Sequence, residues 1–268
     1  MNRSFGFIGC GTMGGALARA ACRGAGAKQI ALSDHTPEKA LELAKELGCR
    51  AADNAAVAAE CDFIFLGVKP QMMADMLAEI APVLASRTTP FVLVSMAAGL
   101  TIARIRALAG GEYPTVRIMP NTPCAVGAGM VLYCAADVCG ADLDDLLAAM
   151  APAGRWDELQ EGLIDAASSV SGCGPAFVYL FLEGLADGAV ACGLPRQKAL
   201  EYAAQTAMGA ARLLLESGAH PGVLKDGVCS PGGTTIQGVR ALEERGFRSA
   251  CMEAVIAAYE KNKDLAKA

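Results

Sequence analysis

Short apolar runs alternate with amphipathic stretches over the first 160 residues of the chain. The runs at 62–68 and 91–95 are almost continuously apolar, which is typical of parallel strands covered on both faces. Between the runs, stretches such as 37–47 and 142–150 have helical spacing. The predicted strands are 4–8, 29–32, 62–68, 91–95, 116–119, 129–133 and 155–158. Strands that alternate with helices in this way predict an α/β fold, in which a parallel sheet carries helices on both faces.

The pattern changes after residue 160, because no strand-like run follows. The predicted helices of this part are 174–193, 197–217, 220–228, 235–245 and 248–263. We therefore expect two domains, an α/β domain over 1–160 and an all-helical domain over 161–268. The central helices carry so few charges that we expect them to be buried. A homodimer interface is the favoured explanation, and a core within one chain is the alternative.

The first predicted strand runs directly into Gly9-Cys10-Gly11-Thr12-Met13-Gly14, and a helical stretch follows. This is the G-x-G-x-x-G pattern with a strand before it and a helix after it, the setting that gives it meaning. The first glycine permits a tight turn, the second lets the backbone approach a pyrophosphate, and the third lets helix and strand pack closely. The pattern predicts a Rossmann-type dinucleotide-binding domain at the N-terminal end.

The second predicted strand ends at Ser33 and Asp34, and Asp34 lies 20 residues after Gly14. A carboxylate there accepts hydrogen bonds from the adenosine ribose and repels a 2′-phosphate, which favours NADH over NADPH. Two alternatives stay open. Ser33, Thr36 and Lys39 could accommodate a phosphate, and Asp34 could be a simple turn residue. In an open parallel sheet the ligand lies beyond the carboxyl ends of the strands, so the exits at 69–71 and 96–99 should also touch the coenzyme.

Composition narrows the classes of function. The net charge is −5 and no basic stripe is present, which argues against nucleic acid or an anionic membrane surface as the main partner. The apolar stretch 176–194 is interrupted by Glu183, Asp187 and glycines, so we interpret it as a buried helix and not as a membrane span. The N-terminal residues lack a signal-peptide layout, which predicts a cytoplasmic protein. Eleven cysteines without C-x-x-C and only two histidines predict reduced thiols and no metal site.

The stretch Cys229 to Gly238 has the features of a small anion-binding loop. Pro231 cannot continue a preceding helix, and glycines leave the backbone amides uncovered. Thr234 and Thr235 are suitable caps for the amphipathic helix that follows. Free amides at a helix start attract a carboxylate, and three hydroxyls lie beside them, on Ser230, Thr234 and Thr235. The alternative is a plain turn between two helices.

Taken together, the motifs resemble those of the pyrroline-5-carboxylate reductases, the enzymes of the last step of proline biosynthesis. The matching segments occur in the family's order along nearly the whole chain. They are F-I-G-C-G-T-M-G (7–14), V-K-P-Q (68–71), M-A-A-G (96–99), R-I-M-P-N-T-P (117–123), S-G-C-G-P-A-F (171–177) and C-S-P-G-G-T-T-I (229–236). The first segment is common to many dehydrogenases, whereas the last two are highly specific.

The resemblance implies a reductase that uses NADPH or NADH to convert 1-pyrroline-5-carboxylate to L-proline. It implies an interlocked homodimer, with dimers that often assemble into rings such as decamers. The implied coenzyme contacts are Gly9, Cys10, Gly11, Thr12, Met13, Gly14, Ser33, Asp34, Asn54, Val68, Lys69, Pro70, Met96, Ala97 and Ala98. The implied substrate contacts are Ser230, Gly232, Gly233, Thr234 and Thr235, and the Thr235 hydroxyl is the catalytic group that meets the ring nitrogen.

A few positions depart from the family pattern. Cys173 and Phe177 stand where serine and tyrosine are usual, and Cys124 stands where alanine is common; we interpret all three as packing variations. Asp34 matters more, because many members favour NADPH. Two other functions fit the sequence less well. A β-hydroxy-acid dehydrogenase would need a catalytic lysine, but neither Lys198 nor Lys225 lies in such a motif. A dinucleotide-binding sensor without catalysis would not need a second anion-binding loop.

Overall fold

The computed structural model describes residues 3–265 and divides into two compact units. We call residues 3–173 with 259–265 the sheet unit, and residues 174–258 the helical unit. The helix after residue 160 thus belongs to the compact sheet unit. The boundary between domains at residues 160 and 161 stays a prediction, because it refers to functional domains and not to compactness.

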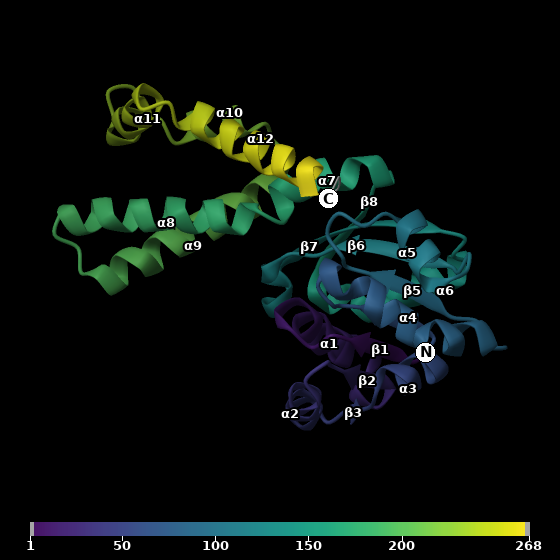
Figure 1. Cartoon of the computed structure of the whole chain (residues 1–268). Helices are drawn as coiled ribbons and strands as arrows, with labels where there is room; N and C mark the ends of the chain where they lie inside the picture. The colour runs from purple at the N-terminus through teal and green to yellow at the C-terminus, as the bar shows by residue number, and fades with distance from the viewer. Residues whose placement is uncertain (1–2, 266–268) are drawn as a thin grey trace. The chain divides into compact units, whose positions relative to one another are not determined.

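An eight-stranded sheet forms the centre of the sheet unit within the described residues, in the order β3-β2-β1-β4-β5-β6-β7-β8 (Figure 1). The strands are β1 (Phe5–Ile8), β2 (Ile30–Ser33), β3 (Arg50–Ala51), β4 (Phe63–Leu66), β5 (Val92–Ser95), β6 (Thr115–Met119), β7 (Gly129–Ala136) and β8 (Gly154–Glu158). The seven predicted strands are present, and the two-residue β3 is an addition that was not predicted. The α/β fold class is confirmed.

One strand pair departs from the predicted parallel arrangement. β6 and β7 pair antiparallel, with Ile118 opposite Tyr133, whereas every other described pair is parallel. The connection between them, residues 120–128, contains only a short 3-10 helix (Thr122–Val126). A parallel crossover needs a dozen or more residues, so this connection is too short to return the chain to the same end of the sheet.

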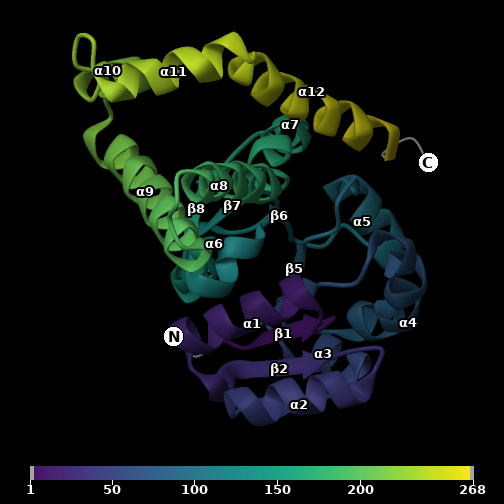
Figure 2. The same ribbon diagram turned by 90° about the vertical axis from the view of Figure 1, so that its left-hand side faces the viewer.

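Helices cover both faces of this sheet (Figures 1 and 2). The helices of the unit are α1 (Thr12–Ala25), α2 (Pro37–Leu47), α3 (Asn54–Glu60), α4 (Met73–Ser86), α5 (Ile102–Ala109), α6 (Gly140–Met150) and α7 (Glu161–Ser171). One apolar cluster includes Leu17, Phe65 and Leu146, and a second includes Val57, Leu66 and Leu77. The Phe7 and Phe65 rings stack with their centroids 4.3 Å apart, which ties β1 to β4 at the middle of the sheet.

The predicted helices of the second part are present. They are α8 (Gly174–Ala191), α9 (Arg196–Ser217), α10 (Pro221–Gly227), α11 (Thr234–Glu244) and α12 (Phe247–Leu265). α8 and α9 lie side by side in both views (Figures 1 and 2). Residues of α12 from Tyr259 onward belong to the sheet unit.

The single chain does not bury the central helices, so a core within one chain does not account for them, and their burial in a homodimer stays a prediction. Among the described residues of the helical unit, only Ala186, Ala199 and Ala203 are buried. On α8, the side chains of Tyr179 and Leu180 are 62% and 72% exposed. By length and composition, residues 161–191 would suffice to cross a membrane, a test that helices of soluble proteins also pass. The chain by itself does not cover this apolar surface.

Candidate active site

The glycine loop between β1 and α1 has the geometry that a bound dinucleotide requires. Gly9 has φ of +106°, which favours glycine, and its amide donates to the Ser33 carbonyl at 2.8 Å. A Cβ on Gly14 would lie 2.0 Å from the Gly9 carbonyl oxygen, so the third glycine is needed for close packing of helix on strand. A Cβ on Gly11 would meet nothing within 4 Å, which leaves room for a pyrophosphate at the start of α1. These residues fit the coenzyme.

Asp34 connects this loop to the turn after β2. Its Oδ2 accepts a hydrogen bond from the Cys10 amide at 2.7 Å, and its Oδ1 accepts one from the Thr36 amide at 2.9 Å. Burial, followed by the nearby Asp34 carboxylate, raises the pKa of the Cys10 thiol to about 12, so this thiol is neutral in the loop. Asp34 therefore holds its own turn together and also binds the backbone of the glycine loop.

A cavity of about 490 Å³ opens beside Asp34, and we call it the ribose pocket because the sequence predicts a ribose contact for Asp34. Its lining residues are Ser33, Asp34, His35, Pro37, Ala40, Leu41, Ala51, Ala52, Asp53, Asn54 and Glu79. Ser33 donates from Oγ to Asn54 Oδ1 at 2.6 Å, and Asn54 Nδ2 donates to Glu79 Oε2 at 2.9 Å. The pocket brings together Ser33, Asp34 and Asn54, as the sequence predicted for coenzyme contacts. It also includes carboxylates but no lysine or arginine.

The exit of β4 lies next to the glycine loop in the sheet, and the exit of β5 lies one strand further along. The Gly67 amide donates to the Ile8 carbonyl at 2.8 Å, which holds the chain after β4 against β1. Two of the predicted coenzyme residues, Pro70 and Ala98, line a further cavity of about 260 Å³, which we call the exit cavity. The other residues that line it are Gln71, Gly99, Met119, Asp165, Ser168, Gly172, Cys173 and Asn262. It therefore adjoins the ends of β4, β5 and β6.

The predicted substrate loop lies in the helical unit. Gly232 has φ of +68°, and the Gly233 amide donates to the Ser230 carbonyl at 3.0 Å, which closes a tight turn before α11. The N-cap residue of α11 is Gly233, and no side chain caps this helix, so the prediction that Thr234 and Thr235 act as caps is wrong. A cap side chain would bind the first backbone amides of the helix, and in α11 no side chain does so. Ser230, Thr234 and Thr235 are exposed, so their hydroxyls are accessible.

Comparison with known proteins shows to which family the chain belongs. The profile described as "Pyrroline-5-carboxylate reductase dimerisation" matches residues 161–265, and "NADP oxidoreductase coenzyme F420-dependent" matches 4–99. A pyrroline-5-carboxylate reductase of Escherichia coli is 41% identical over the full length of both chains. The chain belongs to the pyrroline-5-carboxylate reductase family. Members of this family reduce 1-pyrroline-5-carboxylate to proline with NAD(P)H, so the resemblance seen in the motifs is confirmed.

Solved structures of relatives agree with this assignment. The Plasmodium falciparum pyrroline carboxylate reductase, determined with NADP bound, is 33% identical and superimposes with a TM-score of 0.85. The alignment covers 99% of this chain and 98% of that one. The Coxiella burnetii reductase is 29% identical with a TM-score of 0.90, and 99% of each chain is covered. The present reductase thus has the fold of the family over its whole described length.

A buried ion-pair group lies beside the exit cavity, and the sequence motifs did not predict it. Arg117 on β6 is 2% exposed, and its Nη2 donates to Asp165 Oδ1 at 2.8 Å. Its Nη1 lies 3.5 Å from Glu161 Oε1. An arginine inside the apolar run 116–119 was the available signal, because a guanidinium in a covered strand needs acidic partners. Those partners are on α7, more than 40 residues later in the chain.

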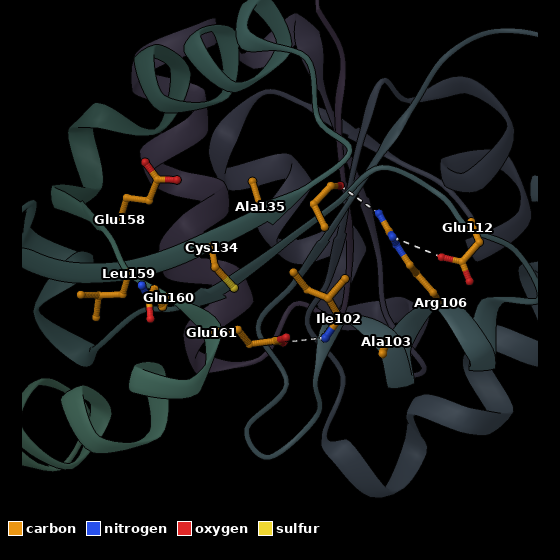
Figure 3. Close-up of a pocket in the computed structure, with 11 residues that line it drawn as sticks. Ile102, Ala103, Arg106, Glu112, Cys134, Ala135, Glu158, Leu159, Gln160 and Glu161 are labelled. Atoms are coloured by element: carbon orange, nitrogen blue, oxygen red, sulfur yellow. Dashed lines mark hydrogen bonds and ion pairs between the residues drawn. The ribbon is translucent and has the colours of Figure 1, made fainter.

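A separate cavity of about 740 Å³ is lined in part by Glu161, the second acidic partner of Arg117, and none of the predicted site residues lines it (Figure 3). Glu161 accepts a hydrogen bond from the Ile102 amide at 2.7 Å and so joins α7 to the start of α5. Arg106 donates to the carbonyls of Tyr113 and Ala136 at 2.8 and 2.9 Å. These groups are engaged in holding the reductase fold together, so the chemistry is better sought at the ribose pocket, the exit cavity and the substrate loop.

Proposed function

We propose that this chain reduces 1-pyrroline-5-carboxylate to L-proline and that Thr235 is its catalytic residue. The observation that carries the proposal is the pairing of a complete dinucleotide loop with a second, exposed loop that ends at a helix start. The substrate is a five-membered cyclic imine with a carboxylate. The amides of Thr234 and Thr235 at the start of α11 hold the carboxylate, and Ser230, Gly232 and Gly233 form the turn that presents them.

The bound coenzyme supplies a hydride to the carbon of the C=N bond. Thr235 orients the ring by hydrogen bonding to its nitrogen, and no general acid is required when the imine enters protonated. Positioning then accounts for most of the effect of the protein, with reacting atoms roughly 3 to 3.5 Å apart. The other proposed coenzyme contacts are the glycine loop, Ser33, Asp34 and Asn54, together with Val68, Lys69, Pro70, Met96, Ala97 and Ala98 at the strand exits.

The direct test is oxidation of the reduced coenzyme with and without pyrroline-5-carboxylate. Replacing Thr235→Val removes the hydroxyl and should lower turnover by about 10- to 1000-fold, since one orienting hydrogen bond is lost. Thr234→Val in the same turn is the matched control and should have a smaller effect. Turnover near normal in Thr235→Val would remove this residue from the mechanism, and no turnover of the wild type would contradict the function.

We also propose that the coenzyme preferred is NADH. Asp34, Asp53 and Glu79 all line the ribose pocket, whereas its cationic candidate is His35 alone, and Lys39 lies outside the lining. A carboxylate has about four lone-pair sites, so Asp34 can accept from two backbone amides and still accept from ribose hydroxyls. A 2′-phosphate would instead meet carboxylates of its own sign.

Replacing Asp34→Ser should shift the ratio of kcat/KM for NADH over NADPH by roughly tenfold or more toward NADPH, because like-charge repulsion is removed. Damage to the glycine loop would affect both coenzymes alike, because both use it, so such damage does not change the ratio. Glu38→Gln on the exposed side of α2 makes the same change in net charge outside the pocket and should leave the ratio unchanged. A wild-type preference for NADPH, or an unchanged ratio in Asp34→Ser, would contradict the assignment.

We further propose that the working form is a cytoplasmic homodimer, with a higher ring such as a decamer as the next level of assembly. The exposed apolar side chains of α8, together with the dimerisation profile over 161–265, support the dimer. An acidic net charge of −5 supports independence from nucleic acid and anionic membranes. Light scattering of the purified protein would give the assembly size, and a monomer at micromolar concentration would contradict the proposal.

A further inference from the structure

The exit cavity contains a carboxylate that the known coenzyme motifs do not explain. Asp165 is the only charged residue among those that line this cavity, and its side chain is 33% exposed. It lies there with Pro70 and Ala98, which belong to the proposed coenzyme contacts. A partly exposed acid at the carboxyl ends of three strands is in the region where an open α/β sheet binds its ligand.

Asp165 is held in place from behind. Its Oδ1 accepts from the buried Arg117 guanidinium at 2.8 Å, so the orientation of the carboxylate is fixed before any ligand arrives. Removing a partner from a buried guanidinium is costly, which keeps this pair together. Because a carboxylate accepts more than one hydrogen bond, Asp165 can also accept one from a group in the cavity.

The neighbouring polar groups on α7 are already engaged with one another. The hydroxyls of Ser168 and Ser169 both donate to the Asp165 carbonyl at 3.0 Å. Asn262 Nδ2 lies 3.4 Å from the same carbonyl and 3.3 Å from Ser168 Oγ, which fastens the end of α12 to α7. These contacts use the main chain of Asp165 and not its carboxylate. The carboxylate of Asp165 is therefore held by Arg117 of β6, while its main chain is held within α7 and by Asn262 of α12.

The proposed coenzyme contacts put the pyrophosphate at the glycine loop after β1 and the adenosine ribose at Asp34 after β2. The nicotinamide is then the part expected on the other side of β1, at the ends of β4 and β5. Its carboxamide carries an NH₂ donor. We propose that Asp165, positioned by Arg117, accepts a hydrogen bond from the carboxamide NH₂ and so sets the orientation of the nicotinamide ring. This inference rests on the proposed coenzyme-dependent function. It adds one residue on α7 to the coenzyme contacts, all of which otherwise lie before residue 99.

The test measures binding and not turnover. The full-length protein is titrated with NAD⁺, with its 3-acetylpyridine analogue, in which a methyl group replaces the carboxamide NH₂, and with ADP-ribose, which lacks the ring. The wild type should bind NAD⁺ about 10-fold more tightly than the analogue, since a hydrogen bond to a charged acceptor is lost. Asp165→Asn should abolish this difference, because its amide oxygen faces Arg117 and its NH₂ cannot accept. ADP-ribose should bind both proteins equally.

Glu161→Gln is the matched control. Glu161 also pairs with Arg117, is exposed to a similar extent at 34%, and lines the other cavity (Figure 3). This variant makes the same change in net charge and should keep the wild-type preference for NAD⁺ over the analogue. Asp165→Ala, checked for folding by circular dichroism, should behave like Asp165→Asn.

Two results would overturn the proposal. The first is a wild type that binds NAD⁺ and the analogue equally, which requires no variant to fold. The second is an Asp165→Asn protein that keeps the full preference, as expected if the acid serves only to hold Arg117. A chain that binds neither NAD⁺, NADP⁺ nor ADP-ribose would contradict the coenzyme-dependent function itself, and the inference with it.

Discussion

The sheet unit and the helical unit differ in how many of their apolar side chains a single chain buries. In the sheet unit, Leu17, Phe65 and Leu77 are completely buried between sheet and helices. In the helical unit, the buried residues are three alanines, and Leu180 remains 72% exposed. Burial of apolar area contributes about 25 cal/mol per Å². The sheet unit thus has a core of its own, whereas the helical unit needs another surface.

The two glycine-containing loops differ in the same way. A Cβ on Gly14 would collide with backbone, because strand and helix of the sheet unit close around the first loop. A Cβ on Gly232 would meet nothing within 4 Å, although its φ of +68° still favours glycine. The glycine loop is held in shape by contacts with the neighbouring strands and with α1. The substrate loop is shaped by its own turn and is open on the outside.

The largest expected effect comes from a change on the exposed apolar face of the helical unit. Leu180→Glu places a charge on the exposed apolar face of α8, which we expect a second copy to cover. A desolvated charge costs several kcal/mol, so the dimer dissociation constant should rise by roughly 1000-fold. Analytical ultracentrifugation would measure this. Leu180→Met, which keeps the face apolar, should remain dimeric. A Leu180→Glu protein that stays dimeric at nanomolar concentration would show that this face is not the interface.

A second prediction sharpens the account of the coenzyme loop. Gly14→Ala places a methyl group 2.0 Å from the Gly9 oxygen, so the loop must shift. We expect a loss of stability of about 1–3 kcal/mol from overpacking and weaker coenzyme binding. Gly11→Ala has open space around its Cβ and should lower coenzyme affinity without lowering Tm. Thermal melts and fluorescence titration separate the two effects, and equal Tm losses in both variants would contradict this account.

The smallest expected effect is a pH dependence confined to the sheet unit. Burial raises the pKa of the Cys61 thiol from 9.0 to about 11. Below pH 9 the thiol is protonated in both the folded and the unfolded state, so its contribution to the free energy of unfolding is fully present. As pH rises from 9 toward 11, the unfolded thiol loses its proton while the folded one keeps it, so stability falls by at most about 1.4 kcal/mol per pH unit.

Urea unfolding at pH 8, 9 and 10 would measure this slope. Cys61→Ala should reduce it, whereas Cys251→Ala, which alters an exposed residue of the helical unit, should leave it unchanged. An identical slope in wild type and Cys61→Ala would remove Cys61 as the cause.

The elements that sequence predicted well are those whose signal is local. The apolar runs 62–68 and 91–95 became β4 and β5, because a strand covered on both faces is almost continuously apolar. β3 was missed because two residues, one of them Arg50, give no periodicity. The direction of β7 was missed because it depends on the length of a connection and not on the strand itself.

The sequence by itself determined the alternation of strands and helices, the dinucleotide loop and the family, because each is written in short-range patterns and residue types. Only the tertiary structure decided that Asp34 accepts from the Cys10 amide, that Arg117 meets Asp165, and that α8 lies exposed in the single chain. Contacts between segments far apart in the chain depend on where the sheet places its neighbours. An amphipathic or apolar pattern states that a face must be covered, but not by what.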